Sequence, residues 1–264
     1  MALVEARNLT KVFAMTESTF GTRSGPHVRA VDNVSIQIAS GETLGLVGES
    51  GSGKSTLGRL LLRLIEPTSG NILFEGSDIT RASGSQMRVF RRDMQIIFQD
   101  PFGSLDPRYR VEDVIAEPIA IHENVSRDTK RRRVAELLRA VGLDESAGRR
   151  YPHEFSGGQR QRIGIARALA LRPKFIVADE PVSALDVSVG AQIVNLLREL
   201  QRQLGLTYLF ISHSMPIVRY LSSRIAVMYR GQVVEVGDTE TITARPSHPY
   251  TASLLAATPE IAVR

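Results

Sequence analysis

The sequence predicts an α/β fold with a mainly parallel sheet, and three observations lead to this expectation. The first is a glycine-rich turn between an apolar strand and an amphipathic helix, within Gly41–Ile65. The second is the alternation of strand-like and helical segments after Gly157, which is typical of a sheet with crossover helices. The third is the strand-like stretch Phe175–Ala178, which leads into two carboxylates.

Composition places the chain among globular proteins. It has 264 residues, of which 42% are hydrophobic and 23% charged, and this excludes a disordered chain. We expect neither a membrane-spanning helix nor a signal peptide, because no uncharged apolar run is long enough and Met1–Lys11 lacks an apolar core. Cysteine is absent, which excludes disulfides and thiolate metal sites. The net charge of +5 suits nucleotides, anionic headgroups or nucleic acid, and selects none of them.

Hydrophobic periodicity predicts the elements in order. Alternation in the first half favours an antiparallel sheet lobe, the polar stretch 14–27 reads as a surface loop, and 111–148 reads as a helical region. A helix after the glycine-rich turn should run to Ile65, and others should cover about 157–171 and 189–204. The predicted strands are Val28–Ala39, Thr43–Val47, Asn71–Phe74, Met94–Phe98, Lys174–Ala178, Thr207–Ser212, Arg224–Tyr229 and Gln232–Val236.

Gly48–Ser55 fits the pattern G-x-x-x-x-G-K-[ST] of a phosphate-binding loop, the Walker A motif or P-loop. Glycines let successive N–H groups converge on phosphate oxygens, and the following helix offers its positive end to the same anion. Lys54 can reach the β- and γ-phosphates, and the Ser55 hydroxyl can ligate Mg²⁺. With a strand before it and a helix after it, a chance glycine turn is a poor explanation. The expected nucleotide contacts are Gly48, Glu49, Ser50, Gly51, Ser52, Gly53, Lys54, Ser55 and Thr56.

Asp179 and Glu180 follow the apolar strand, where Asp179 could hold Mg²⁺ through water in the Walker B role. Glu180 could act as the general base for an attacking water. An acidic pair at a strand end is unspecific by itself, since many such pairs are solvated or cap a helix. The phosphate-binding loop in the same chain is what favours the catalytic interpretation.

Ser156, Gly157 and Gly158 open a predicted helix and form a second possible anion site, made of a hydroxyl, bare N–H groups and a helix dipole. From the residues alone, the simpler interpretation is an N-cap by Ser156 followed by flexible glycines. A second phosphate site makes sense only if it serves the nucleotide of a neighbouring molecule.

In this order, the motifs resemble those of the ATP-binding subunit of an ABC transporter. They are the phosphate-binding loop, Gln99 after a strand, SGGQ from Ser156, Asp179-Glu180, Ser183–Asp186, and His213 after a strand. The resemblance covers nearly the whole chain. The stretches Phe98–Arg108, Tyr151–Leu169 and His248–Pro259 resemble the dipeptide/oligopeptide import family, which includes nickel and opine importers.

The resemblance implies a single nucleotide-binding domain over residues 1–264, with a RecA-like, three-layer P-loop core. An antiparallel β lobe would cover about 1–45 and 66–90, a helical lobe about 100–160, and a short C-terminal tail 237–264.

It also implies ATP hydrolysis with ATP and Mg²⁺, in a head-to-tail pair of subunits in which Ser156 and Gly158 contact the partner's γ-phosphate. Phe13 would stack on adenine, although a place in the core is an open alternative. The implied catalytic residues are Lys54, Gln99, Glu180 and His213; the metal ligands are Ser55, Gln99 and Asp179; the further nucleotide contacts are Phe13, Ser156, Gly157, Gly158, Gln159 and Asp186.

The implied partners are a second ATPase subunit, identical or homologous, two membrane-spanning permease subunits and an extracytoplasmic solute-binding protein. The chain would then sit peripherally at the cytoplasmic face of the inner membrane, with Phe102, Leu105 and Tyr109 as an exposed docking surface or, alternatively, a local mini-core. The cargo stays open. One rival is a soluble ABC-type ATPase acting on nucleic acid, which the basic charge favours slightly. The other is a small-molecule kinase, which SGGQ and His213 disfavour.

Overall fold

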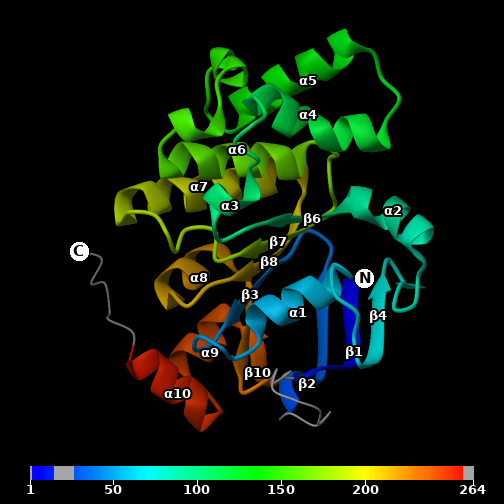
Figure 1. Cartoon of the computed structure of the whole chain (residues 1–264). Coiled ribbons are helices and arrows are strands. Elements are labelled where there is room, and N and C mark those ends of the chain that lie inside the picture. Colours follow the sequence, from blue (N-terminus) through cyan, green and yellow to red (C-terminus); the bar gives the residue numbers. More distant parts are fainter. Residues whose placement is uncertain (1, 15–26, 258–264) are drawn as a thin grey trace, which may run out of the picture. The chain divides into compact units, whose positions relative to one another are not determined.

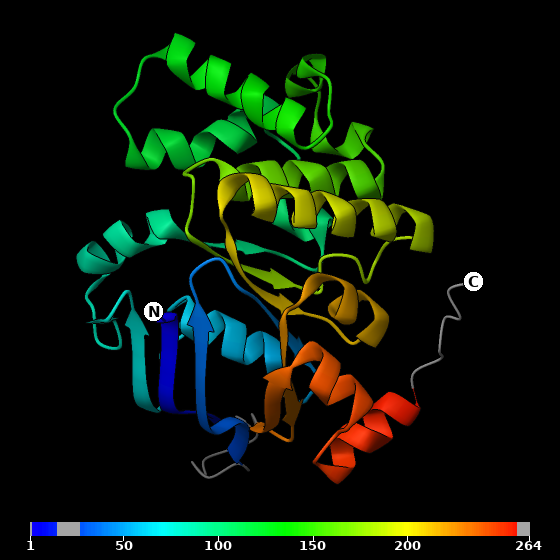
Figure 2. The ribbon, with the colours of Figure 1, turned by 180° about the vertical axis from the view of Figure 1, so that it is seen from behind.

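The computed structural model describes residues 2–14 and 27–257 (Figures 1 and 2). The chain divides into two compact units. Unit 1 consists of Met1–Met87 and Leu209–Arg264, and unit 2 of Arg88–Tyr208. Each unit combines strands with helices, as an α/β chain should. The loop predicted at 14–27 lies, except for its two end residues, outside the described residues.

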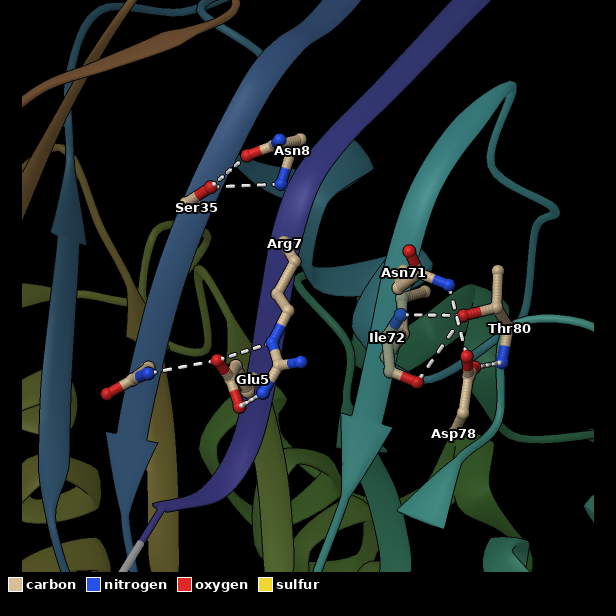
Figure 3. Close-up of polar contacts among 9 residues, drawn as sticks. Glu5, Arg7, Asn8, Ser35, Asn71, Ile72, Asp78 and Thr80 are labelled. Carbon is tan, nitrogen blue, oxygen red and sulfur yellow. Dashed lines mark hydrogen bonds and ion pairs between the residues drawn. The ribbon is translucent and has the colours of Figure 1, made fainter. Parts of the chain in front are cut away.

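Unit 1 contains an antiparallel sheet in the order β2-β1-β4-β5. Its long central strand β1 pairs with β2 on one side and β4 on the other. Apolar side chains of β2 alternate inward, and polar side chains link the strands on the exposed face (Figure 3): Glu5 accepts hydrogen bonds from Arg7 and Gln37, and Asn71 donates to Asp78. The strands are β1 (Ala2–Ala14), β2 (His27–Ala39), β4 (Ser69–Phe74) and β5 (Ser77–Asp78).

Unit 1 also holds a pair of parallel strands, one of which leads into the phosphate-binding loop. Strand β3 is buried at every position and runs parallel to β9, which pairs in turn with antiparallel β10. The chain leaves β3 through the glycine loop and enters α1, and the described part of the predicted C-terminal tail contains two short helices. The elements are β3 (Thr43–Val47), α1 (Lys54–Leu61), β8 (Thr207–Ile211, at the boundary between units), α8 (Met215–Leu221), β9 (Arg224–Tyr229), β10 (Gln232–Asp238), α9 (Thr239–Ala244) and α10 (Pro249–Ala256).

The prediction that the first helix continues to Ile65 is wrong. Helix α1 ends at Leu61, because Arg63 adopts a left-handed backbone with φ of 51°. The Arg63 guanidinium is buried and donates to the carbonyl oxygen of Ile79 at 3.1 Å, which holds the chain in this turn.

Unit 2 carries two parallel strands and most of the helices. Strand β6 pairs with β7 in parallel, and helices α4, α5 and α6 pack on one another through buried aliphatic side chains such as Ile119 and Leu138. The elements are α2 (Gly84–Asp93, which begins in unit 1), β6 (Met94–Ile97), α3 (Pro101–Ser104), α4 (Val111–His122), α5 (Arg127–Ala140), η1 (Glu145–Arg149), η2 (Pro152–Glu154), α6 (Gly157–Leu169), β7 (Phe175–Asp179) and α7 (Val187–Leu204).

One of the three apolar residues expected on a docking surface is buried. Phe102 and Tyr109 are 61% and 55% exposed, but Leu105 is only 2% exposed. Leu105 therefore belongs to the core of unit 2, as the mini-core alternative holds, and the candidate docking surface is reduced to Phe102 and Tyr109.

Candidate functional site

The phosphate-binding loop closes around the ammonium group of Lys54. Its Nζ donates to the carbonyl oxygens of Gly48 at 2.8 Å and Glu49 at 2.7 Å, and lies 3.4 Å from the Ser52 hydroxyl. The Lys54 side chain is only 5% exposed, so these oxygens compensate for its lost hydration. The cation is thus fixed at the centre of the loop by the loop's own backbone.

Three glycines give the loop its shape for two different reasons. A Cβ on Gly48 would lie 2.1 Å from the carbonyl oxygen of Met228, and one on Gly53 would lie 2.1 Å from that of Ala30. These two residues must be glycine because backbone from elsewhere in unit 1 passes against them. Gly51 has open space around it but a φ of +79°, so there the backbone conformation requires glycine.

Helix α1 presents its N-terminus at the end of this loop. Its N-cap is Gly53, no side chain caps it, and the first turn holds no acidic residue. The first N–H groups of a helix lack intrahelical partners and carry positive partial charge, which suits an anionic phosphate. Ser55 and Thr56 lie in this first turn and are half-buried.

Phe13 and His213 belong to the same unit as the loop. Phe13 lies near the end of β1 with its ring 41% exposed and the Lys11 ammonium 5.1 Å from the ring centroid. The alternative that Phe13 packs in the core is therefore wrong, and its exposed face is what stacking on a base requires. His213 lies two residues after the end of β8 and is exposed.

Unit 2 brings together two residues that are far apart in sequence. Gln99, just after β6, donates its amide Nε2 to the Glu180 carboxylate at 3.3 Å. Glu180 follows β7 with a left-handed φ of 46°, a conformation that a residue with a Cβ adopts only at a cost. Asp179, the last residue of β7, is 3% exposed. Glu180, one of the two carboxylates predicted at the end of this strand, thus lies beside the glutamine that follows β6.

Ser156 of the SGGQ motif is an N-cap, as the simpler interpretation predicts. Gly158, however, is required by close packing and not by flexibility. Ser156 caps α6, and Gln159 completes a capping box by accepting from the Ser156 N–H at 3.1 Å. A Cβ on Gly158 would lie 2.3 Å from Val189 Cγ1 in α7, so only glycine allows this close approach of the two helices. Ser156, Gly157 and Gln159 are nevertheless exposed, so the cap remains open to a partner.

The loop before α7 extends this exposed surface. Asp186 is the N-cap residue of α7, yet its side chain makes no capping hydrogen bond. The next residue, Val187, is 91% exposed although it is apolar. No sequence signal indicates Val187, because a single valine at a helix start carries no periodicity. An apolar side chain that protrudes into solvent is suited to a contact with another molecule.

The oxygen donors predicted for Mg²⁺ fit that ion by their chemistry. They are a hydroxyl in Ser55, an amide in Gln99 and a carboxylate in Asp179, and Mg²⁺ prefers oxygen ligands, with few from protein and the others from phosphates and water. Within the part of the chain that the structure describes, no group of three or more His, Asp or Glu side chains forms a metal site from protein alone.

Comparison with known proteins places these motifs in a family. Residues 31–183 match the family model described as ABC transporter. The chain is 53% identical over 259 residues to the oligopeptide transport ATP-binding protein OppF of Bacillus subtilis, covering 97% of this chain and 82% of OppF. It is 54% identical to the glutathione import ATP-binding protein GsiA of Salmonella typhimurium, covering 97% of this chain but 41% of GsiA.

Solved structures agree with the sequence comparison. The dimeric post-hydrolysis structure of the ATP-binding cassette MJ0796, bound to ADP and phosphate, superimposes with a TM-score of 0.79 at 30% identity. The match covers 89% of this chain and 98% of that one. CbiO1 of Clostridium perfringens, part of the ABC transporter complex cbiONQ, gives a TM-score of 0.78 over 92% of this chain and 91% of its own. The predicted fold, an α/β P-loop cassette, is confirmed by these matches.

Proposed function

The chain belongs to the ABC transporter family and hydrolyses ATP, and we propose that it is the subunit that energises uptake of peptides or a similar small solute. The observation that carries this proposal is the identity of more than half of its residues, over 97% of its length, to OppF, an oligopeptide transport protein. The same relatives speak against the alternative of an ATPase acting on nucleic acid, since those named above serve oligopeptide transport or glutathione import.

Nucleotide binding is the role of unit 1 in this proposal. The triphosphate lies along the loop Gly48–Thr56, whose N–H groups and helix N-terminus meet its negative charge. Lys54 keeps its hydrogen bonds to the carbonyl oxygens of Gly48 and Glu49 and directs its third N–H to the β- and γ-phosphate oxygens. Phe13 stacks on the adenine and His213 contacts the γ-phosphate.

Hydrolysis is the role of the residues after β6 and β7. When Mg²⁺ is bound, it neutralises charge on the phosphates, and Ser55, Asp179 and Gln99 are the residues that would hold it. The Glu180 carboxylate takes the proton of the attacking water. The Gln99 amide, which donates to that carboxylate at 3.3 Å, orients it for this task.

Two subunits complete each other's sites in the proposed assembly. The Ser156 hydroxyl and the N–H groups of Gly157 and Gly158 face the γ-phosphate held by the partner's loop, with Gln159 and Asp186 beside them. Three features support this: Ser156, Gly157 and Gln159 are exposed, Asp186 does not use its carboxylate as a cap, and Val187 protrudes as an apolar contact. The MJ0796 cassette, which is dimeric and held ADP and phosphate, has the same fold.

Transport requires further partners, which we propose to be two membrane-spanning permease subunits and an extracytoplasmic solute-binding protein. No helix among the described residues is both long and apolar enough to cross a bilayer. The chain would attach to the permeases at the cytoplasmic face of the membrane through the exposed Phe102 and Tyr109.

Uptake in reconstituted vesicles tests this function. The chain is placed in vesicles with a homologous ATPase subunit and candidate permease and solute-binding proteins of the same organism, and uptake of labelled peptides and glutathione is followed. We expect uptake that needs ATP and stops with Glu180→Gln. An ATPase activity stimulated by DNA or RNA at physiological salt, with no uptake of any of these solutes, would establish the nucleic-acid alternative instead.

A further inference from the structure

Tyr250 contacts the phosphate-binding loop from the opposite end of the chain. Its hydroxyl accepts a hydrogen bond from the backbone N–H of Glu49 at 3.0 Å. Both residues belong to unit 1. Tyr250 lies outside residues 31–183, the part of the chain that matches the family model. The contact is therefore additional to the nucleotide-binding motifs described above.

The peptide unit between Gly48 and Glu49 is held on both of its sides. Its N–H, that of Glu49, donates to Tyr250, and its carbonyl oxygen, that of Gly48, accepts from Lys54 Nζ at 2.8 Å. Gly48 also leaves no room for a Cβ against the carbonyl of Met228. A rotation of this planar unit would thus displace one of the oxygens on which Lys54 rests, and with it the position of the ammonium group.

Tyr250 is itself fixed by packing and by hydrogen bonds. Its ring stacks on Tyr229 at the end of β9, with ring centroids 4.1 Å apart and an interplanar angle of 30°. His248 caps α10 by accepting from the Tyr250 N–H through Nδ1 at 3.1 Å. The Glu235 carboxylate in β10 accepts from the N–H groups of Ser247 and His248 at 2.7 and 3.1 Å. The hydroxyl therefore reaches Glu49 from an anchored segment.

The Tyr250 hydroxyl stays neutral at this position, and a neutral hydroxyl can accept a hydrogen bond from a backbone N–H. Partial burial raises the pKa of Tyr250 above its ordinary value of 10.0. At physiological pH the contact is a neutral hydrogen bond whose strength does not change with small changes in pH.

We propose that Tyr250 is a positioning residue for nucleotide binding, which sets the peptide unit between Gly48 and Glu49 and through it Lys54. The inference rests on the proposed role of the loop in holding the phosphates. Because the contact exists before ATP arrives and involves no reacting atom, its loss should weaken binding of substrate and transition state alike. Such a loss raises KM and leaves kcat nearly unchanged.

The test uses Tyr250→Phe, which removes only the hydroxyl, with Tyr220→Phe as a matched control. Tyr220 is an exposed tyrosine of α8 in the same unit. The ATP dissociation constant is measured by calorimetry with Mg²⁺, and KM and kcat by phosphate release. For Tyr250→Phe we expect the dissociation constant and KM to rise about 3- to 10-fold, the range of one neutral hydrogen bond, with kcat within twofold of wild type. Tyr220→Phe should change none of them.

A second variant separates positioning from simple packing. Tyr250→Leu loses the stacked ring as well, and it should raise the dissociation constant at least as much while also lowering the melting temperature. Tyr250→Phe should melt as the wild type does. Unchanged ATP affinity in Tyr250→Phe, with a wild type that binds ATP, would refute the positioning role alone. A wild type that does not bind ATP would refute the proposed role of the loop and this inference with it.

Discussion

Alanine at Gly158 should destabilise unit 2, whereas alanine at the adjacent Gly157 should not. The new Cβ at Gly158 would lie 2.3 Å from Val189 Cγ1, far inside van der Waals contact. Valine is restricted to one preferred side-chain rotamer in a helix, so Val189 cannot simply turn away and α6 must shift from α7. At Gly157 the nearest atom is Leu185 Cδ2 at 3.3 Å, the end of a flexible side chain.

The expected magnitude follows from two opposing terms. Overpacking of this kind costs about 1–3 kcal/mol, and replacing glycine by alanine in a helix returns up to about 1 kcal/mol. Because a separation of 2.3 Å puts the clash in the upper part of that range, at about 2–3 kcal/mol, the net loss for Gly158→Ala is about 1–2 kcal/mol. For Gly157→Ala the clash term nearly vanishes, so stability should be equal to wild type or higher by a fraction of about 1 kcal/mol.

Guanidinium unfolding followed by circular dichroism measures the difference, and Val189→Ala supplies the control. This second change removes the clashing methyl group. The double variant Gly158→Ala/Val189→Ala should therefore be nearly as stable as Val189→Ala alone, whereas Gly158→Ala should be clearly less stable than wild type. If Gly158→Ala were as stable as wild type, or if Val189→Ala gave no recovery, the close approach of α6 and α7 would not be why this residue is glycine.

Three further predictions concern other parts of the molecule. Lys54→Ala should lower hydrolysis on the order of 10²-fold or more, because it removes the loop's fixed cation, and phosphate release near the wild-type rate would exclude Lys54 from its role. Phe102→Ala should leave folding and basal hydrolysis unchanged but uncouple transport, and unchanged uptake and co-purification with the permeases would exclude Phe102 from docking. Arg133 hydrogen-bonds Glu123 and thereby lowers the pKa of that carboxyl below 4.5. The resulting gain in the free energy of unfolding is present above pH 4.5 and is lost as the pH falls through the lowered pKa. Arg133→Gln should therefore flatten the acid limb of the stability–pH curve, and an acid limb identical to that of wild type would contradict this.

The strands that sequence predicts best are the buried ones. Thr43–Val47 and Arg224–Tyr229 coincide with β3 and β9 because uninterrupted apolar runs have sharp ends. Strand β1 was not predicted, since register shifts after Ala6 and Leu9 interrupt the alternation by which an exposed strand is recognised. The end of α1 was placed too late because Leu64 continues the apolar stripe, although its side chain is exposed.

Some features of the candidate site are local in the sequence and can be predicted from it, whereas others are contacts between distant segments. The phosphate-binding loop and the SGGQ cap are continuous in sequence, and their glycines and capping residues can be read directly. The contacts Gln99–Glu180 and Glu49–Tyr250 join segments that are distant along the chain. No spacing rule predicts such pairs, because they depend on how strands and helices are packed.

ATP-dependent association of Glu180→Gln tests the central claim most directly. The amide keeps the size of the side chain but cannot accept a proton, so hydrolysis should stop while Lys54, Ser55 and Asp179 still serve to bind ATP. Size-exclusion chromatography, with the chain alone and with each homologous ATPase subunit encoded beside it, should show a dimer with Mg·ATP and a monomer without it. Adding Ser156→Arg should abolish the dimer. A chain that stays monomeric with every such partner at saturating ATP would contradict the head-to-tail pair.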